Sequence, residues 1–411
     1  MIVGLFVGIW ITRYLGPNQF GLLSFTQSFV ALFSTLASLG INNVVIRELA
    51  KDERNPGVLI GTSFLLLLIG SIITILVIYS STQFLNYDSL TKNLILIVSL
   101  SIFFQSFNVI DFYFQSKVLS RYVVISNIIV LFFSSVLKIF LLLTKASLMA
   151  FAMVALFDGL VLVLGFCYFF YMSFDFLTNR IKFSFDVAKS LLKDSWSYIF
   201  SGVLVSIYMK IDQVMLKEIL GDYAVGQYSA AIRLSEVWYF IPMVVCSSLL
   251  PAIVNAKKQD KSSYENRLSK LYALMVFAAL IISVPLSFSS HFIVSFLYGR
   301  QYAEASGILM VHIWATVFVF IGVAGGKWLL VENLQMFSFF NTFVGALVNI
   351  ALNLLWIPDY GGVGAAWATF FAQAFAAYFS MFFWKSTRAN FYMLTRAIFM
   401  FPGYIFIKHR L

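Results

Sequence analysis

The sequence predicts an all-α, polytopic membrane protein with about twelve transmembrane helices in two six-helix bundles. Of its 411 residues, 61% are apolar and only 11% are charged, whereas soluble domains have about 45–50% and 25%. The mean hydropathy is +0.90, and many apolar runs approach the roughly 20 residues that cross a bilayer as a helix. These runs lack the residue-by-residue alternation of a transmembrane β-barrel. The composition therefore excludes a soluble globular protein.

Charged residues, glycine and proline separate the apolar segments and so define the expected helices. The first segment, 2–12, is too short to span a bilayer and has neither a basic leader nor a small-residue cleavage site. It is therefore interpreted as a truncated first helix, not as a signal peptide. A final apolar stretch, 391–407, contains Arg396 and Pro402 and is expected to be interfacial or partly inserted. Between them lie eleven full segments, at about 21–46, 57–80, 93–115, 122–143, 147–172, 195–216, 225–254, 271–290, 305–331, 337–356 and 362–384.

Basic residues are distributed unequally between the two sets of loops that alternating helices place on opposite sides. Sixteen Lys and Arg residues fall in one set, five fall in the other, and three lie in the tail. By the positive-inside rule, the richer set and the C-terminus face the cytoplasm. The net charge of +10 thus has a topological explanation and requires no nucleic acid. Four basic residues remain inside the expected helices: Lys138, Lys210, Arg233 and Lys327.

The longest polar connection, 173–194, divides the chain into an N-terminal bundle at 1–172 and a C-terminal bundle at 195–387. A basic, partly apolar tail follows at 388–411, and the connection is expected to be cytoplasmic. Repeated halves are common in transporters, where the substrate path lies between them. A short repeat supports this division, although chance agreement also explains it: Leu15-Gly16, Gly21 and Ser24 recur 205 residues later as Leu220-Gly221, Gly226 and Ser229.

Ionisable side chains inside a bilayer usually face a partner or a water-filled cavity, because an isolated charge there is costly. The four intramembrane basic residues are matched by four acidic ones, so mutual pairing and a functional cavity are both open interpretations. Arg233 and Glu236 are three residues apart and can pair on one helix face. Lys210 and Asp212 point to different faces. The acidic residues are Asp111, Asp158, Asp212 and Glu236.

Arg13 and Arg47 lie where the first two helices meet the membrane interfaces. Interfacial anchoring explains both, and Glu48 can neutralise Arg47. Alternatively, guanidinium groups at the mouth of a cavity hold phosphate oxygens bidentately. The candidate contacts for an anionic headgroup are Arg13, Arg47, Lys210, Arg233 and Lys327.

Motifs for several other functions are missing from the sequence. It contains no GxxxxGK[ST] phosphate loop, no HExxH and no GxGxxG following a strand, so nucleotide hydrolysis and metalloprotease chemistry have no support. Cys167 and Cys246 are isolated in apolar runs, and His291, His312 and His409 have no ligand-like spacing. We therefore predict no metal site, no catalytic residues and no enzyme activity.

Several stretches together resemble the O-antigen (Wzx-type) flippases of the multidrug/oligosaccharidyl-lipid/polysaccharide (MOP) exporter superfamily. The run TRYLGPNQFGL at 12–22 resembles the family's turn after the first helix, and LGI at 39–41 and RELA at 47–50 continue the likeness. In the second half, KIDQVML at 210–216, GQYSAA at 226–231, YGRQY at 298–302 and IPDYGGVGAA at 357–366 are similar to later family signatures. The likeness extends over nearly the whole chain, in the correct order, but the start of the first helix is missing.

The resemblance implies a MATE/MOP-like fold and a flippase activity. The substrate would be an undecaprenyl-pyrophosphate-linked oligosaccharide, carried by alternating access across a bacterial inner membrane. The basic candidates would hold the pyrophosphate. The family implies no cofactor but coupling to H⁺ or Na⁺, for which Asp212 and Glu236 are the candidate carboxylates. Expected partners are membrane lipids, a polysaccharide polymerase and a chain-length regulator.

Two alternatives remain open at this point. A MATE-type drug or cation antiporter would share the two bundles but would need a cavity dominated by carboxylates. A membrane polysaccharide polymerase or ligase would need catalytic groups on a sizeable loop, and no expected external loop exceeds roughly fifteen residues when spans are about 20 residues long.

Overall fold

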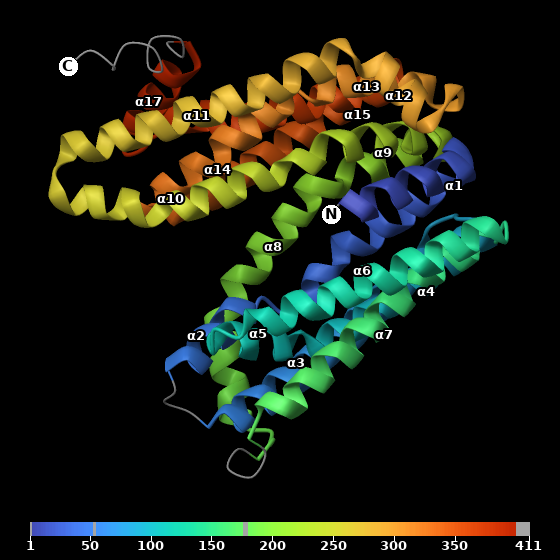
Figure 1. The fold of residues 1–411 in the computed structure, drawn as a ribbon, viewed down its shortest axis with the longest axis horizontal. Coiled ribbons are helices and arrows are strands. Elements are labelled where there is room, and N and C mark those ends of the chain that lie inside the picture. Colours follow the sequence, from blue (N-terminus) through green and yellow to red (C-terminus); the bar gives the residue numbers. More distant parts are fainter. Residues whose placement is uncertain (1, 52–54, 176–179, 400–411) are drawn as a thin grey trace. The chain divides into compact units, whose positions relative to one another are not determined.

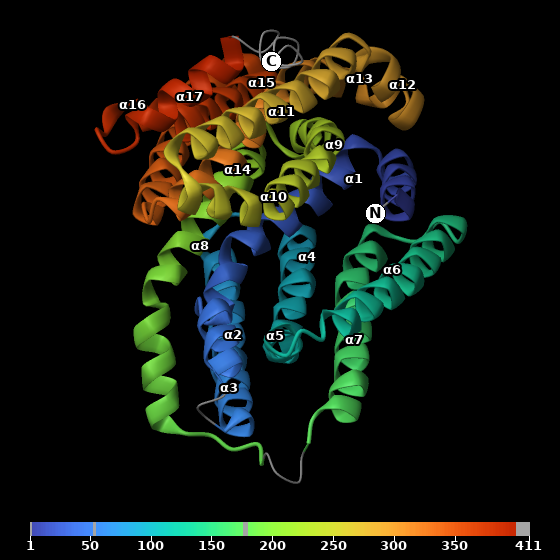
Figure 2. The same ribbon diagram turned by 60° about the vertical axis from the view of Figure 1, so that its left-hand side comes forward.

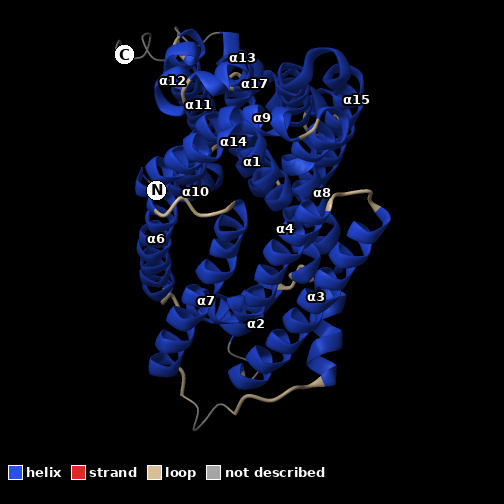
Figure 3. Ribbon diagram, turned by 90° about the vertical axis from the view of Figure 1, so that its right-hand side faces the viewer, coloured by secondary structure: helices blue, strands red, loops and turns tan. Residues whose placement is uncertain are grey.

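The computed structural model describes residues 2–51, 55–175 and 180–399. All regular structure in these ranges is helical, and Figure 3 accordingly draws no strand in them. Within them, nine helices are long and apolar enough to cross a membrane, or ten if the bent pair Arg300–His312 and Ala315–Val331 forms one span. The chain is therefore an all-α, multi-pass membrane protein as predicted, and the exact count of twelve spans stays a prediction.

The chain folds as two compact units, here called unit 1 and unit 2. Unit 1 comprises Met1–Leu15 and Leu22–Val214, and unit 2 comprises Gly16–Gly21 and Met215–Leu411. The boundary falls inside one long helix, α8 (Phe185–Leu220), beyond the predicted connection at 173–194. The assignment of bundles to 1–172 and 195–387 stays a prediction.

Unit 1 buries a core in which α2 packs against α3 and α5, and α7 packs against α4, η1 and α6. Figure 1 shows α6 and α7 side by side. Ile41, Leu59 and Phe114 are among the fully buried core residues. Besides most of α8, the elements of this half are α1 (Ile2–Ala37), of which Gly16–Gly21 belong to unit 2, α2 (Asn42–Lys51), α3 (Pro56–Phe84), α4 (Ser89–Leu100), the 3₁₀ segment η1 (Ser101–Phe107), α5 (Asn108–Ser116), α6 (Ser120–Leu143) and α7 (Leu148–Ser173).

Unit 2 is organised around α11, which packs against α10, α14 and α17. Figure 2 shows α12 and α13 at one end of this unit and α16 and α17 at the other. Its elements are α9 (Asp222–Glu236), η2 (Val237–Tyr239), α10 (Phe240–Gln259), α11 (Lys261–Phe288), α12 (Ser290–Tyr298), η3 (Arg300–Tyr302), α13 (Ala303–His312), α14 (Ala315–Val331), α15 (Gln335–Ala374), the π-helical η4 (Phe375–Phe379), α16 (Ser380–Phe383) and α17 (Arg388–Phe399).

Two of the long helices are kinked where the sequence analysis places a break between segments. Gly16 (φ 69°, ψ 170°) interrupts α1, and Gly361 (φ 56°, ψ −137°) interrupts α15. Glycine adopts such positive φ angles without a steric penalty. Each kink joins two predicted segments, which is one reason why the count of long helices is lower than twelve.

Other element boundaries differ from the prediction. The segment expected at 21–46 is broken, because α1 ends at Ala37 and α2 begins at Asn42, with Leu39 and Gly40 at positive φ between them. Helix α8 begins at Phe185, so part of the predicted connection is helical. Of the stretch expected at 391–407, residues 400–407 lie outside the described residues.

Candidate functional site

The motif stretches of the sequence meet at one end of unit 2, which we call the motif end. The amide of Gln227 donates to the Gln301 carbonyl at 2.8 Å, and its Oε1 accepts from the Ala305 backbone N–H at 3.0 Å. These bonds join 226–231 to 298–302. A Cβ on Gly362 would lie 2.5 Å from Ile308 Cδ1 and 3.8 Å from Tyr228 Cβ, so 357–366 packs there too.

The N-terminal motif belongs to the same end. A Cβ built on Gly21 would lie 1.8 Å from the carbonyl oxygen of Asp222, and one on Gly226 would lie 2.0 Å from that of Pro17. Only glycine permits this backbone approach. The kink at Gly16 turns the chain into this contact, since Pro17 directly follows it.

Arg233 lies beside aromatic residues of the motif end. Its guanidinium carbon is 5.1 Å from the ring centroid of Phe20, a cation–π geometry. Phe20 contacts Tyr302 edge to face at 6.4 Å, and Tyr302 contacts Tyr298 at 5.4 Å. Glu236, three residues along α9, interacts electrostatically with Arg233. A guanidinium has planar N–H donors, a geometry that suits phosphate oxygens.

Lys327, the third basic candidate in unit 2, lies on α14. Its Nζ donates to Ser247 Oγ on α10 at 3.5 Å, and the residue is half-buried. The hydrogen bond is long, so α10 holds this ammonium only weakly.

In unit 1, Lys210 and Asp212 lie on α8 within a polar contact between α8 and α1. Gln213 accepts a hydrogen bond from Ser28, and Ser206 and Thr35 approach to 2.6 Å. Asp212 is buried, with 5% of its surface exposed, and Lys210 is half-buried. The two side chains therefore have different environments, as their spacing on the helix predicts.

Arg13 and Arg47 lie in separate parts of unit 1. Arg13 lines a cavity of about 310 Å³ together with Trp10, Tyr14, Ile139, Leu142 and Leu143. Arg47 forms ion pairs with Asp194 at 2.8 Å and with Glu48 at 3.1 Å. Half of the Arg47 side chain is exposed, so it connects α2 to α8 and its charge is already neutralised by carboxylates.

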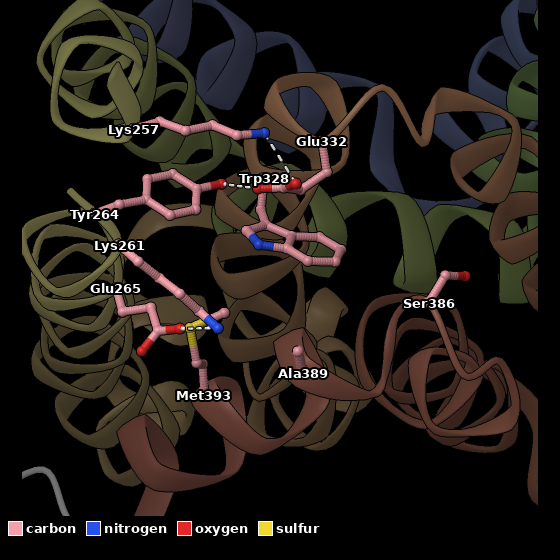
Figure 4. Close-up of a pocket in the computed structure, with 9 residues that line it drawn as sticks. All are labelled: Lys257, Lys261, Tyr264, Glu265, Trp328, Glu332, Ser386, Ala389 and Met393. Carbon is pink, nitrogen blue, oxygen red and sulfur yellow. Dashed lines mark hydrogen bonds and ion pairs between the residues drawn. The ribbon is translucent and has the colours of Figure 1, made fainter. Parts of the chain in front are cut away.

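A second cavity, of about 470 Å³, lies in unit 2, and none of the predicted site residues lines it. Figure 4 shows Lys257 and Tyr264 pointing toward Glu332. Lys257 Nζ lies 2.9 Å from Glu332 Oε2, and the Tyr264 hydroxyl donates to Oε1 at 2.6 Å. Burial raises the pKa of the Glu332 carboxyl, but hydrogen bonds from Tyr264 and Lys257 lower it by more, so the net pKa lies below its usual range. The other lining residues are Lys261, Glu265, Trp328, Ser386, Ala389 and Met393.

This cavity was not predicted from the sequence, because its lysines, Lys257 and Lys261, are explained there by the unequal charge of the two sets of loops. Its lining residues come from α10, α11, α14 and α17 and from the segments that follow α14 and α16; the predicted topology expects this end of unit 2 on the cytoplasmic side. The available signal was Glu332, an acidic residue in an expected loop on the basic side. Within the described ranges, no group of three or more His, Cys, Asp or Glu residues is arranged to hold a metal ion.

The structure therefore divides the seven predicted site residues between the units. Arg13, Arg47, Lys210 and Asp212 belong to unit 1, and Arg233, Glu236 and Lys327 belong to unit 2. Arg233 and Glu236 share one helix and interact. A common cavity for these residues stays a prediction.

Comparison with known families identifies the chain. Residues 1–257 match the family described as polysaccharide biosynthesis protein, more than half of the sequence. The chain belongs to the polysaccharide biosynthesis protein family. Residues 198–355 also match the MatE family. The two family matches together confirm the predicted resemblance to the MOP superfamily.

Three curated relatives of this polysaccharide biosynthesis protein are distant. They are the capsular polysaccharide biosynthesis protein CapF of Staphylococcus aureus (21% identical over 45% of the chain and 47% of the relative), the probable low-salt glycan biosynthesis flippase Agl15 of Haloferax volcanii (24%; 47% and 41%) and a putative O-antigen transporter of Shigella dysenteriae (20%; 46% and 48%). Each match spans under half of the relative's length. The prediction that the chain is not an enzyme agrees with a flippase and a transporter among these relatives.

Solved structures confirm the predicted MATE/MOP-like fold of this family member. An inward-facing multidrug resistance MATE family transporter of the MOP superfamily superposes with a TM-score of 0.77 and 14% identity, over 96% of this chain and 95% of that one. The lipid II flippase MurJ, in an inward closed conformation, superposes with a TM-score of 0.76 and 16% identity, over 99% and 90%.

Proposed function

We propose that this protein is a flippase for a lipid-linked oligosaccharide. The substrate is an undecaprenyl-pyrophosphate-linked repeat unit of O-antigen or a related polysaccharide, moved from the cytoplasmic to the periplasmic leaflet of a bacterial inner membrane. The observation that carries the proposal is the polysaccharide biosynthesis family match over residues 1–257. The MurJ-like fold over 99% of the chain supports it, because that fold is compatible with transfer of a lipid-linked sugar.

The chemistry of such a substrate explains why a bundle with internal charges suits it. The pyrophosphate and sugars need a hydrophilic route, whereas the long prenyl chain stays in the lipid. Two repeated bundles that rock about a central path supply such a route by alternating access. The C-terminus and the 173–194 connection then face the cytoplasm, as the basic residues favour.

We assign the pyrophosphate contacts to the basic candidates, with Arg233 first among them. Its guanidinium stacks on Phe20, so its donors are preorganised for a diphosphate. Lys327 and Lys210 would add attraction as point charges. Arg13 and Arg47 are assigned a weaker role, since Arg47 is already paired with Asp194.

Coupling to a proton or sodium gradient belongs to the same proposal. Asp212 is a buried carboxylate in a membrane helix, and Glu236 lies on α9 beside Arg233. A polysaccharide polymerase and a chain-length regulator are the proposed protein partners, because an exported repeat unit must be polymerised afterwards.

Complementation tests the proposed function. The chain is expressed in a strain that lacks its own O-antigen flippase, and surface polysaccharide is measured together with the protein level. Restored polysaccharide at normal protein abundance is expected. Absence of export across a panel of flippase-deletion strains with different repeat units, with the protein present in the membrane, would contradict the proposal.

A MATE-type drug or cation antiporter is the second candidate, favoured by the MatE match at 198–355 and by the TM-score of 0.77. Drug resistance conferred by the chain in an efflux-deficient strain, without any polysaccharide export, would favour this alternative. A polymerase or ligase is the third, and longer glycan chains assembled by the purified protein would favour it.

A further inference from the structure

The cavity of about 470 Å³ in unit 2 has no role in the proposed pyrophosphate site, because none of the basic candidates lines it. Its volume lies within the range of roughly 300–1,000 Å³ that is typical of small-molecule sites. Its charged lining residues are two lysines and two glutamates, Lys257, Lys261, Glu265 and Glu332. Positive and negative groups are therefore equal in number, which suits neither a purely anionic nor a purely cationic ligand.

One side of this cavity is already satisfied by contacts within the protein. Lys257 Nζ lies 2.9 Å from Glu332 Oε2 and donates to the Val331 carbonyl at 2.8 Å. It also lies 5.8 Å from the ring centroid of Tyr264, whose hydroxyl donates to the other oxygen of Glu332. These contacts join the ends of α10 and α11 to the end of α14. We assign these residues to the structure of the cavity and not to ligand binding.

The other side of the cavity presents two charges that contact each other only weakly. Lys261 Nζ and Glu265 Oε1 are 3.9 Å apart on α11, too far for a hydrogen bond. The Lys261 side chain is 88% exposed and that of Glu265 is 53% exposed. Figure 4 shows this pair on the far side of Trp328 from Lys257. An exposed ion pair of this length contributes little to stability, so both groups can turn to a ligand at small cost.

An aromatic ring lies near the weak pair. Trp328 is buried in the core of unit 2, with 5% of its surface exposed, and it also lines the cavity. In the view of Figure 4 its indole lies between the Glu332 carboxylate and the Lys261 ammonium. Indole gives the strongest cation–π attraction of the aromatic side chains. An indole and a carboxylate in one cavity suit an ammonium group, and a lysine in the same cavity suits a phosphate.

The cavity lies where membrane-spanning helices end. Helix α10 ends at Gln259, α11 begins at Lys261 and α14 ends at Val331, and each belongs to a segment apolar enough to cross a membrane. The polar headgroups of a bilayer lie at the ends of such segments. The apolar side chains of Ala389 and Met393 on α17 complete the lining. A lipid headgroup can therefore reach the cavity from the bilayer.

We propose that this cavity binds the headgroup of a zwitterionic phospholipid, one that carries a phosphate and a primary ammonium as phosphatidylethanolamine does. The phosphate contacts Lys261, and the ammonium contacts Glu265 and the Trp328 ring. The ligand takes the place of the weak contact between Lys261 and Glu265, so that each of these charges gains an opposite charge. The acyl chains remain in the bilayer. This lipid site does not depend on the flippase function.

Charge complementarity distinguishes this headgroup from other lipid headgroups. An anionic headgroup, such as that of phosphatidylglycerol, would draw Lys261 away from Glu265 and bring a second negative charge toward that carboxylate, which repels it. A choline headgroup carries both charges, but its quaternary ammonium has no N–H donor for Glu265. The expected order of affinity is therefore phosphatidylethanolamine first, phosphatidylcholine second and phosphatidylglycerol third.

Native mass spectrometry of the full-length protein in detergent tests this order directly. Lys261→Met should weaken phosphatidylethanolamine binding about tenfold, as the loss of one charge-assisted contact implies. Glu265→Gln should weaken it by a similar factor but should not weaken phosphatidylglycerol binding, because that lipid has no ammonium group. Lys258→Met is the matched control, since it removes an exposed lysine that does not line the cavity, and it should bind all three lipids as the wild type does.

Soluble phosphoethanolamine distinguishes a lipid from a water-soluble ligand. It should displace little bound lipid at equal concentration, because the lipid also contacts the protein through its acyl chains. Equal affinity for the soluble compound and the lipid would overturn the assignment to a lipid. The melting temperatures of Lys261→Met and Glu265→Gln in phosphatidylglycerol nanodiscs should match the wild type. Equal wild-type affinity for phosphatidylethanolamine and phosphatidylglycerol, or unchanged phosphatidylethanolamine binding by both folded variants, would overturn the site.

Discussion

Gly21 and Gly226 pack reciprocally: each glycine lies against the backbone of the residue that precedes the other by four positions. Gly21 lies against the carbonyl of Asp222, and Gly226 lies against the carbonyl of Pro17. Residue 222 follows residue 17 by 205 positions, and residue 226 follows residue 21 by the same displacement. Such reciprocity is typical of a contact between two copies of one motif related by a two-fold axis. The two copies of the sequence repeat, at 17–21 and 222–226, therefore pack against each other.

This contact predicts that alanine at either glycine destabilises the protein. A Cβ 1.8 or 2.0 Å from a carbonyl oxygen forces the two backbones apart, which costs at least about 1–3 kcal/mol, as overpacking in a tight core does. We expect Gly21→Ala and Gly226→Ala to lower membrane abundance and melting temperature. Both are measured by detergent-solubilised size-exclusion and thermal denaturation.

Gly326→Ala is the matched control, since nothing lies within 4 Å of its Cβ position. It should fold normally, because alanine also favours the helix over glycine. Normal abundance and melting temperature for both Gly21→Ala and Gly226→Ala would show that the close approach is absent in the membrane.

Much of this fold can be predicted from local sequence chemistry. The glycine–proline cluster at 16–17 indicates a break, and the structure has a kink at Gly16. The Gly361-Gly362 pair indicates another, at Gly361. The break at Leu39 was not predicted, because a leucine at positive φ is stabilised by tertiary packing, here the approach of α8 to Gly40, and not by local preference.

The functional residues were less predictable than the fold. Apolar periodicity shows that Lys138 and Asp158 are inside the membrane, but not that they pair between α6 and α7 at 3.6 Å. Similarly, the four helices α11 to α14 separate Lys257 from Glu332 in the sequence, so nothing local indicates that these two residues line one cavity. Residues from different helices meet through packing, which a sequence pattern encodes only indirectly.

Topology provides the next prediction. Lys189 and Asp222 lie near opposite ends of the α8 region, separated by 33 residues and roughly 50 Å at 1.5 Å per residue. Reporter fusions at the two positions should report opposite sides, with Lys189 cytoplasmic. The same side for both would contradict the charge-based topology.

Replacing Arg233 with lysine should reduce polysaccharide export more than expected for a residue that acts only through its positive charge. Its planar guanidinium stacks on Phe20 at 5.1 Å, and an ammonium cannot form a bidentate fork to a diphosphate. We expect Arg233→Ala to abolish polysaccharide export and Arg233→Lys to reduce it about tenfold or more, as the loss of roughly 1.5–3 kcal/mol from one charge-assisted bond implies. Lys327→Arg should be milder than Arg233→Lys.

The same assay tests the whole set of candidates. Arg13, Arg47 and Lys210 are replaced by alanine and by the other basic residue, alongside Arg233 and Lys327. If all five alanine variants export polysaccharide at normal protein levels, the phosphate-contact hypothesis fails.

Glu332 should make stability depend on acid pH. Hydrogen bonds hold its pKa below the usual value in the folded protein, so its contribution is present above the unfolded value of about 4.3. That contribution is lost as pH falls through the lower, folded pKa. Glu332→Gln should lower the free energy of unfolding at neutral pH by roughly 1–2 kcal/mol and make it depend less on acid pH. Unfolding is monitored by the fluorescence of Trp328, which lines the same cavity.

Glu265→Gln controls for a nearby glutamate. Its pair with Lys261 is 3.9 Å long and more than half exposed, so its removal should change stability little. Equal losses of stability in Glu332→Gln and Glu265→Gln would show that the Lys257–Tyr264–Glu332 contacts stabilise the fold no more than the exposed Lys261–Glu265 pair does.

The final prediction concerns Asp212 as a coupling carboxylate. It is buried on α8, and the sequence offers no basic residue at three or four positions on either side of it, so its charge is answered by another helix, by water or by a bound cation. A carboxylate whose surroundings differ between two conformations changes its proton affinity between them, which gradient-driven exchange requires. A static ion pair makes a different prediction for Asp212→Asn: breaking it lowers stability and abundance. A coupling role instead predicts a normally folded Asp212→Asn that no longer responds to an imposed ion gradient, measured in proteoliposomes at matched protein levels. Gradient-dependent transport by a well-expressed Asp212→Asn would remove Asp212 from the coupling mechanism.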